Sequence, residues 1–136
     1  MSRQRGSTSL ELVLLTPALL VLMVFVVFVG RLAEARADVD RAAREAARAG
    51  SLARSPHAAL EGGVAAAGST LREGGMACRS LRVDIDVAGF APGGNVLATV
   101  SCTVALEDLS PLRIPGSRTV VATFTQPVDN YRGIAS

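Results

Sequence analysis

Tryptophan and lysine are absent from this chain of 136 residues, and histidine and tyrosine each occur once. Aromatic residues make up only 4% of the chain and charged residues 19%, whereas hydrophobic residues make up 49%. A soluble globule of this size normally carries more aromatic and charged side chains. The high hydropathy, built from Ala, Val and Leu, therefore indicates a membrane segment and Ala-rich helix beside a modest core.

The sequence contains few of the side-chain patterns that nucleic-acid-binding, catalytic or metal-binding proteins require. Every basic residue is arginine, and the arginines are scattered singly without interleaved aromatics, which predicts no nucleic-acid binding. No nucleophile elbow, phosphate-binding loop or Cys/His ligand set occurs, so we expect no catalytic residues, metal or cofactor. His57 has no second histidine near it and is predicted to be solvated, and Asp84 and Asp86 are expected on a solvated strand face rather than at a cation.

The longest apolar run extends from Leu12 to Val29 and contains only Thr16 and Pro17 as interruptions. As a helix it would span about 27 Å, close to the ~30 Å hydrocarbon core of a bilayer. The run therefore predicts a transmembrane helix over residues 7–30. Because proline has no N–H and frees the carbonyl of Val13, we expect a kink at Pro17.

Residues 31–50 continue the same helix outside the lipid. Arg and Ala dominate, opposite charges recur at helical spacing, and an apolar stripe follows three- and four-residue steps: Leu32, Val39, Ala42, Ala43 and Ala46. The stripe is interpreted either as packing on the chain's own domain or as subunit packing in a filament. One helix from about Ser9 to Ala49 is predicted, with Gly50 as its C-cap signal.

The remaining residues, 51–136, predict a small α+β domain. Ser55 and Pro56 are typical of a helix start, Leu60, Val64, Ala67 and Leu71 would share one face, and Gly74-Gly75 would end this second helix. Three alternating stretches then predict a three-stranded antiparallel meander: residues 81–87, 96–106 and 119–125. The fold expected is α+β and pilin-like, with a long N-terminal helix ahead of the domain.

The stretch RQRGSTSLELVLLTP combines a short basic leader with a carboxylate at the start of the apolar run. Glu11 is the fifth residue after Gly6, and this arrangement resembles the class III leader peptide of type IV pilins. In that family a membrane peptidase cuts after the glycine, which here lies before Ser7 and would make residues 1–6 the leader. The cut would leave a charged amine on Ser7, four residues and one helical turn from Glu11.

Over nearly the whole chain the sequence resembles TadE-like proteins, the minor pilins (pseudopilins) of tight-adherence (Flp) pili. Gly6, Glu11 and Pro17 match the spacing in that family. The distal stretches CRSLRVDIDV and VSCTVALEDLSPLRIPGSRTVVATFTQPVDNYRG resemble those of members from high-GC genomes. One departure is Leu12, where the major pilins and many members carry an aromatic residue, which leaves the processing peptidase open.

The resemblance implies a structural role in assembling a tight-adherence pilus. Its expected partners are the membrane, a prepilin peptidase, other pilins in a hetero-oligomer, and the pilus assembly platform. The N-terminus would be cytoplasmic and residues 51–136 extracytoplasmic, although the arginines after residue 30 count against this orientation.

A different class of function is also compatible with the sequence. Ala33-x-Ala35 has the small-residue pattern of an ordinary signal peptidase site, and a cut there would leave a mature chain starting at Arg36. The product would be a secreted binding domain unrelated to pili. With no cut, the helix would serve as a plain anchor for such a domain.

Two cysteines, Cys78 and Cys102, both follow the apolar run. In an extracytoplasmic compartment they could form a disulfide, and in the alternative they are two buried free thiols. A hairpin turning near Pro92 does not place them opposite each other. A bond between them therefore needs Cys78 to fold back just before its strand.

Overall fold

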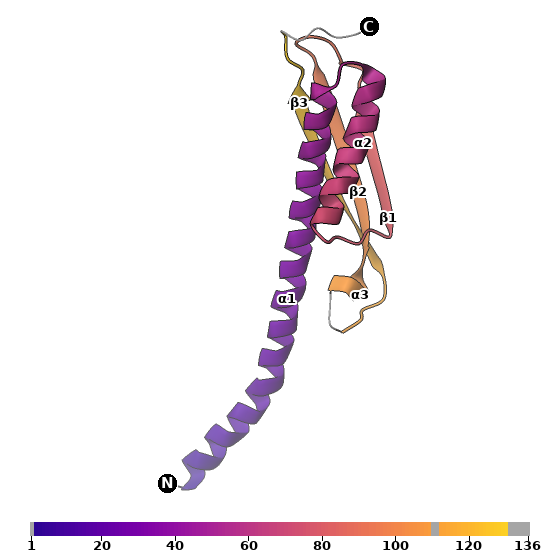
Figure 1. The fold of residues 1–136 in the computed structure, drawn as a ribbon. Helices are drawn as coiled ribbons and strands as arrows, with labels where there is room; N and C mark the ends of the chain where they lie inside the picture. The colour runs from indigo at the N-terminus through magenta and orange to yellow at the C-terminus, as the bar shows by residue number, and fades with distance from the viewer. Residues whose placement is uncertain (1, 110–111, 131–136) are drawn as a thin grey trace.

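The structure, a computed structural model, describes residues 2–109 and 112–130, with side chains from residue 6 onward. The elements are α1 (Ser2–Leu52), α2 (Pro56–Glu73), β1 (Ser80–Asp86), β2 (Asn95–Ala105), α3 (Leu106–Leu109) and β3 (Ser117–Pro127). Figure 1 shows α1 extending far beyond a small domain in which α1 and α2 lie side by side against a sheet. The predicted α+β fold is confirmed.

The sheet is antiparallel with the strand order β1-β2-β3, which is the predicted meander. Its inner face carries the alternating apolar residues of the central strand, all buried: Val96, Ala98, Val100, Cys102 and Val104. The outer face is mostly polar, and two threonine pairs cross it between β2 and β3, Thr99 with Thr123 and Thr103 with Thr119. One face is thus covered by helices and the other is left to solvent.

The turn between β1 and β2 is built on glycine. A Cβ on Gly94 would collide with the carbonyl oxygen of Gly89, and Gly93 has a φ of 78°. Hydrogen bonds from Gly94 N–H to Ala91 C=O and from Asn95 N–H to Gly89 C=O close the turn. The hairpin turn expected near Pro92 is therefore present, because glycine tolerates the close approach at Gly94 and the left-handed backbone at Gly93.

The first helix continues two residues beyond the expected stop at Gly50. Gly50 is buried inside α1, and a Cβ there would lie 2.9 Å from Cγ1 of Val96. The prediction of Gly50 as the end of the helix was therefore wrong. The glycine is instead placed where helix and sheet approach each other too closely for a side chain.

The second helix begins and ends as predicted but buries a different face. Ser55 caps it, with its Oγ accepting a hydrogen bond from Ala58 N–H at 3.1 Å, and Pro56 is its first residue. The buried residues are Ala59, Gly63, Ala67 and Leu71, whereas Leu60 and Val64 are exposed. The predicted face was wrong by one residue in its first half, because the small side chains let α2 approach α1 more closely than leucine would.

One short element was not predicted. The sequence predicted no helix after β2, but residues 106–109 form α3 and bury Leu109. A hydrogen bond from Leu106 N–H to Gly116 C=O at 3.0 Å then joins the two ends of the excursion between β2 and β3. Tyr131, in the closing Pro-Val-Asp-x-Tyr-Arg stretch, lies outside the described residues.

Candidate functional site

The N-terminal half of α1 exposes its largest apolar side chains. Its most apolar window is long enough to cross a membrane, and none of that window is buried. Leu12, Leu14 and Met23 keep about two thirds of their surface accessible, and only Val24 and Phe28 of residues 12–30 are partly buried. A helix of this kind cannot be the core helix of a soluble domain, so it suggests a membrane anchor.

The carboxylate of Glu11 lies at the start of this exposed apolar surface. Residues 7 and 11 belong to the same uninterrupted helix, which places Ser7 one turn before Glu11 on the same face. Gly6 has no atom within 4 Å of the position that a Cβ would take. The side chains of Arg3 and Arg5 lie outside the described residues. The cut after Gly6 and the role of Glu11 stay predictions.

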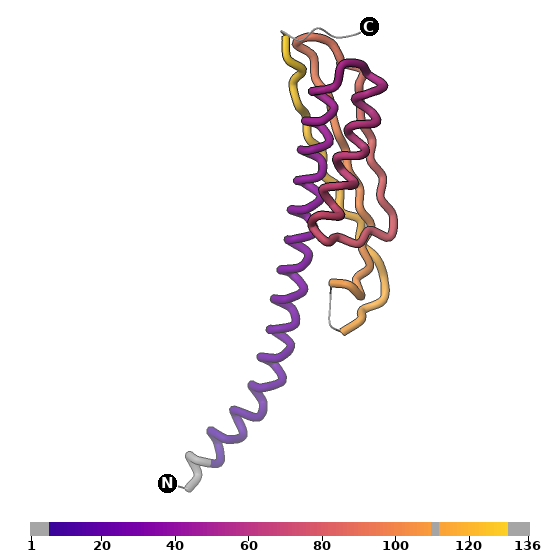
Figure 2. The backbone as a smooth tube through the Cα atoms, viewed as in Figure 1, coloured from indigo at the N-terminus to yellow at the C-terminus, as the bar shows by residue number. Residues whose placement is uncertain are grey.

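Pro17 lies inside α1 without ending the helix. The preceding residue, Thr16, turns its hydroxyl back and donates a hydrogen bond to the carbonyl of Leu12 at 2.8 Å. Threonine bonds of this kind and proline both favour helix bending. Figure 2 shows the N-terminal half of α1 curving away from the line of the C-terminal half. A kink localised at Pro17 stays a prediction.

The C-terminal half of α1 packs on the chain's own domain. Ala35, Val39 and four further alanines, Ala42, Ala43, Ala46 and Ala47, are buried against α2 and the sheet. On the solvent side Arg44 pairs with Asp40 at 2.7 Å, and its guanidinium lies 5.6 Å from the ring centre of Phe124. This part of the stripe is occupied within the monomer and is not free for a neighbouring subunit.

The disulfide between Cys78 and Cys102 is present, with their Cα atoms 5.4 Å apart. The strand register pairs Cys102 with Leu81, so Cys78 is not its direct partner across the ladder. The bond forms because residues 76–79 fold back over the inner face of the sheet, and Met76 Sδ lies 3.8 Å from Cys102 Sγ. The predicted bond is confirmed, including the fold-back that it required.

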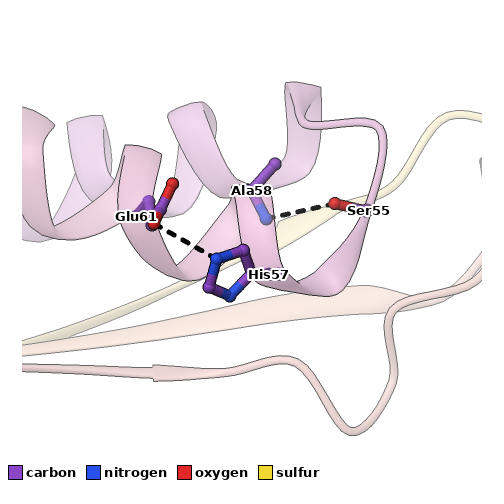
Figure 3. Close-up of polar contacts among 4 residues, drawn as sticks. All are labelled: Ser55, His57, Ala58 and Glu61. Carbon is purple, nitrogen blue, oxygen red and sulfur yellow. Dashed lines mark hydrogen bonds and ion pairs between the residues drawn. The ribbon is translucent and has the colours of Figure 1, made fainter.

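His57 lies on the outer surface of α2. Its Nε2 is 3.2 Å from Glu61 Oε1, and the two side chains are 82% and 72% exposed. Figure 3 shows this pair one helical turn apart, beside the Ser55 cap. Asp86 accepts a hydrogen bond from Ala88 N–H, which makes it a turn residue. Among the described residues no group of three or more His, Cys, Asp or Glu could hold a metal ion.

One surface feature was missed by sequence reasoning. Past α3, the side chains of Leu112 and Ile114 are 67% and 41% exposed, in a stretch for which no helix or strand was predicted. The signal available in the sequence was two apolar residues flanking Arg113. That signal is ambiguous without knowing which part of the molecule the loop lies beside.

Comparison with known proteins found a similarity within α1. The model of the family described as TadE-like protein matches residues 6–48, which run from the glycine before Ser7 to the last turns of α1. No curated protein and no solved structure matches the chain. The family suggests involvement in the Tad pilus system. The resemblance drawn from the sequence is thereby confirmed over residues 6–48, where the chain is similar to TadE-like proteins.

Proposed function

We propose that the chain is a membrane-anchored minor pilin, or pseudopilin, that takes part in assembling a tight-adherence type IV pilus. Its role is structural rather than catalytic, and its partners are other pilins and the membrane platform of the assembly machinery. The observation that carries the proposal is the division of α1 within a TadE-like segment. One half is exposed and apolar over its length, and the other is locked into a small domain.

This division supports lateral assembly through the exposed half. The domain half of α1 already packs its apolar face on α2 and the sheet, so that face is not available to helices of other subunits. The exposed half offers Leu, Val, Phe and Met side chains on every side. In lipid, and later in a filament, such a surface packs against equivalent helices by close van der Waals contact.

Glu11 is the polar feature of that surface. A carboxylate at the bilayer centre costs about 2.5–3.5 kcal/mol on insertion scales, and less near the edge. Removing the leader after Gly6 would create an ammonium group at Ser7, on the same face of the same helix. The amine of this subunit or of a neighbour would offset the cost, and a pairing between subunits would set their axial register.

The disulfide supports an extracytoplasmic position for the domain. Disulfides persist in oxidising compartments and are rare in the cytoplasm. With the domain outside, the leader lies on the cytoplasmic side, where a prepilin peptidase acts. A reporter fused after Ser136 should therefore be active only outside the cytoplasm, and activity confined to the cytoplasm would reverse this orientation.

The experiment that tests the assembly role is the substitution Glu11→Leu, with Glu11→Gln as a variant closer in shape. We expect both proteins to insert in the membrane at least as well as the native chain, because a charge has been removed from the apolar segment. Surface pili, counted by electron microscopy and in sheared fractions, should fall to a small fraction of the native level. Glu45→Gln, on the exposed side of the domain half, is the matched control and should leave piliation unchanged.

Normal piliation in both Glu11 variants would contradict the role assigned to the carboxylate. The N-terminal sequence of the mature protein tests the wider proposal. A start at Ser7 supports the pilin route, a start at Arg36 supports a secreted binding domain, and a start at Met1 supports a plain anchor.

A further inference from the structure

The central strand returns the chain from the tip of the domain to the point where α1 leaves the apolar run. At the distal end Val96 lies against Gly50 of α1. At the other end Val104 lines a groove together with Arg31. Gly50 and Arg31 are about 28 Å apart along a helix at 1.5 Å per residue. Val96 and Val104 are about 27 Å apart in an extended strand, so the two elements run antiparallel over the same length.

The end of β2 therefore lies level with the first charged residue after the apolar run. Val29 closes that run, and Arg31 follows after Gly30. If residues 7–30 span the bilayer, Arg31 lies in the headgroup region, where arginine side chains reach the lipid phosphates. Asp108 and Leu109 of α3 line the same groove as Arg31, so α3 lies at headgroup level as well.

The chain after α3 goes further in the same direction. The hydrogen bond between Leu106 and Gly116 holds the two ends of the excursion together at the sheet. Figure 1 shows α3 and the described residues after it projecting past the end of the sheet, in the direction of the N-terminal end of α1. Leu112 and Ile114 expose their side chains in this projection, and Arg113 between them has a φ of 49°. Residues other than glycine adopt this left-handed backbone uncommonly, and residues so held cluster at functional sites.

We propose that Leu112, Arg113 and Ile114, named here the loop tip, form a second membrane contact in the leaflet from which α1 emerges. The inference rests on the proposed placement of α1 across the membrane. Leu112 and Ile114 enter the boundary between headgroups and acyl chains, and Arg113 binds the lipid phosphates. The lipid surface is the chosen occupant because α3 shares a groove with Arg31, the first charged residue after the apolar run, and the chain beyond α3 projects further toward the N-terminal end of α1. The contact would hold the sheet domain in one orientation above the bilayer before assembly.

The absence of tryptophan makes a single-tryptophan measurement possible in the full chain. The variant Leu112→Trp is reconstituted in nanodiscs at one copy per disc. The lipids are phosphatidylcholine and phosphatidylglycerol with brominated acyl chains. The emission wavelength of the tryptophan and its quenching by the brominated lipid are measured. Val21→Trp, inside the apolar run, is the positive control. Val121→Trp, 58% exposed on β3, is the negative control, and it carries the same indole. Ile114→Trp is a second reporter in case the first variant fails to fold.

We expect blue-shifted emission for Leu112→Trp or Ile114→Trp, with quenching by brominated lipid that approaches that of Val21→Trp. Emission and quenching equal to those of Val121→Trp would overturn the proposal. A blue shift that appears only with two or more copies per nanodisc would also overturn it, in favour of a second copy of the chain as the occupant. Absence of quenching in Val21→Trp would show that α1 is not in the bilayer, which defeats the proposed function and this inference together. If Val21→Trp is quenched and neither loop-tip variant is, the loop-tip contact is disproved and the membrane placement of α1 stands.

Discussion

The two halves of α1 place apolar side chains by opposite rules. In the half before Arg31 the large residues are exposed, as at Leu14 and Phe25. In the half after it the buried residues are small, and Ala42 and Ala46 have no accessible surface. One continuous helix therefore has large side chains facing outward along one half and small side chains facing inward along the other.

The difference teaches what each environment demands. Lipid chains rearrange around any side-chain shape, so a membrane half needs apolar area and no particular volume. A protein interior is close-packed and rearranges little around a side chain, so the domain half needs side chains of the right size. Gly63 of α2 illustrates this demand, because a Cβ there would lie 3.2 Å from the carbonyl oxygen of Ala46.

Removing the disulfide should have the largest effect and should separate the two halves most clearly. In the chain-entropy model the bond, with a sequence separation of 24 residues, stabilises the domain by about 3 kcal/mol. The double substitution Cys78→Ser and Cys102→Ser should lower the free energy of unfolding of the domain by about that amount. The measurement is urea unfolding of the full chain in detergent micelles, followed by circular dichroism.

The helical signal of the membrane half should survive when the domain of this variant unfolds, because its hydrogen bonds are internal to the helix. The native chain treated with a reductant is the control and should behave in the same way. Loss of all helical signal in one transition would show that the two halves unfold as a single cooperative unit. That result would contradict the difference drawn between them.

The same substitution at two alanines of α1 should sharpen the comparison directly. Ala46→Leu adds volume at a position with no accessible surface, beside Gly63, and should destabilise the domain by about 2 kcal/mol. Ala18→Leu makes the same change on the exposed apolar half and should leave domain stability unaltered. Urea midpoints of the two variants in micelles give the result, and equal midpoints would remove the distinction between the halves.

A neighbouring pair of glycines in α2 should show the smallest effect, with opposite signs. Gly63→Ala places its Cβ 2.8 Å from Cδ1 of Ile85 and should cost about 1 kcal/mol. Gly62→Ala meets no atom within 4 Å and should stabilise the helix by about 0.5–1 kcal/mol. Differential scanning calorimetry of the two variants checks the signs. A gain of stability at both positions would mean that the packing around Gly63 is looser than its burial indicates.

Most secondary structure was readable from local signals. The caps at Ser55 and Pro56, the alternation along β2 and the glycine-rich turn each depend on residues close in the chain, and each formed as predicted. The buried face of α2 was not readable in the same way. Leu60 and Val64 are the more hydrophobic choice, but the close approach of two helices selects Ala59 and Gly63. Hydrophobicity ranks side chains by transfer energy, whereas packing selects them by size.

The site shows the same division between local and long-range information. The amino-acid sequence by itself determined the apolar span, the spacing of Gly6, Ser7 and Glu11, and the resemblance to TadE-like proteins, because each depends only on residue type and order along one helix. Only the tertiary structure decided that α1 is packed on its own domain after Arg31, that Cys78 reaches Cys102, and that α3 shares a groove with Arg31. These features depend on how the sheet packs against α1, which brings together residues far apart in the chain. A pattern of neighbouring residues does not specify such long-range contacts.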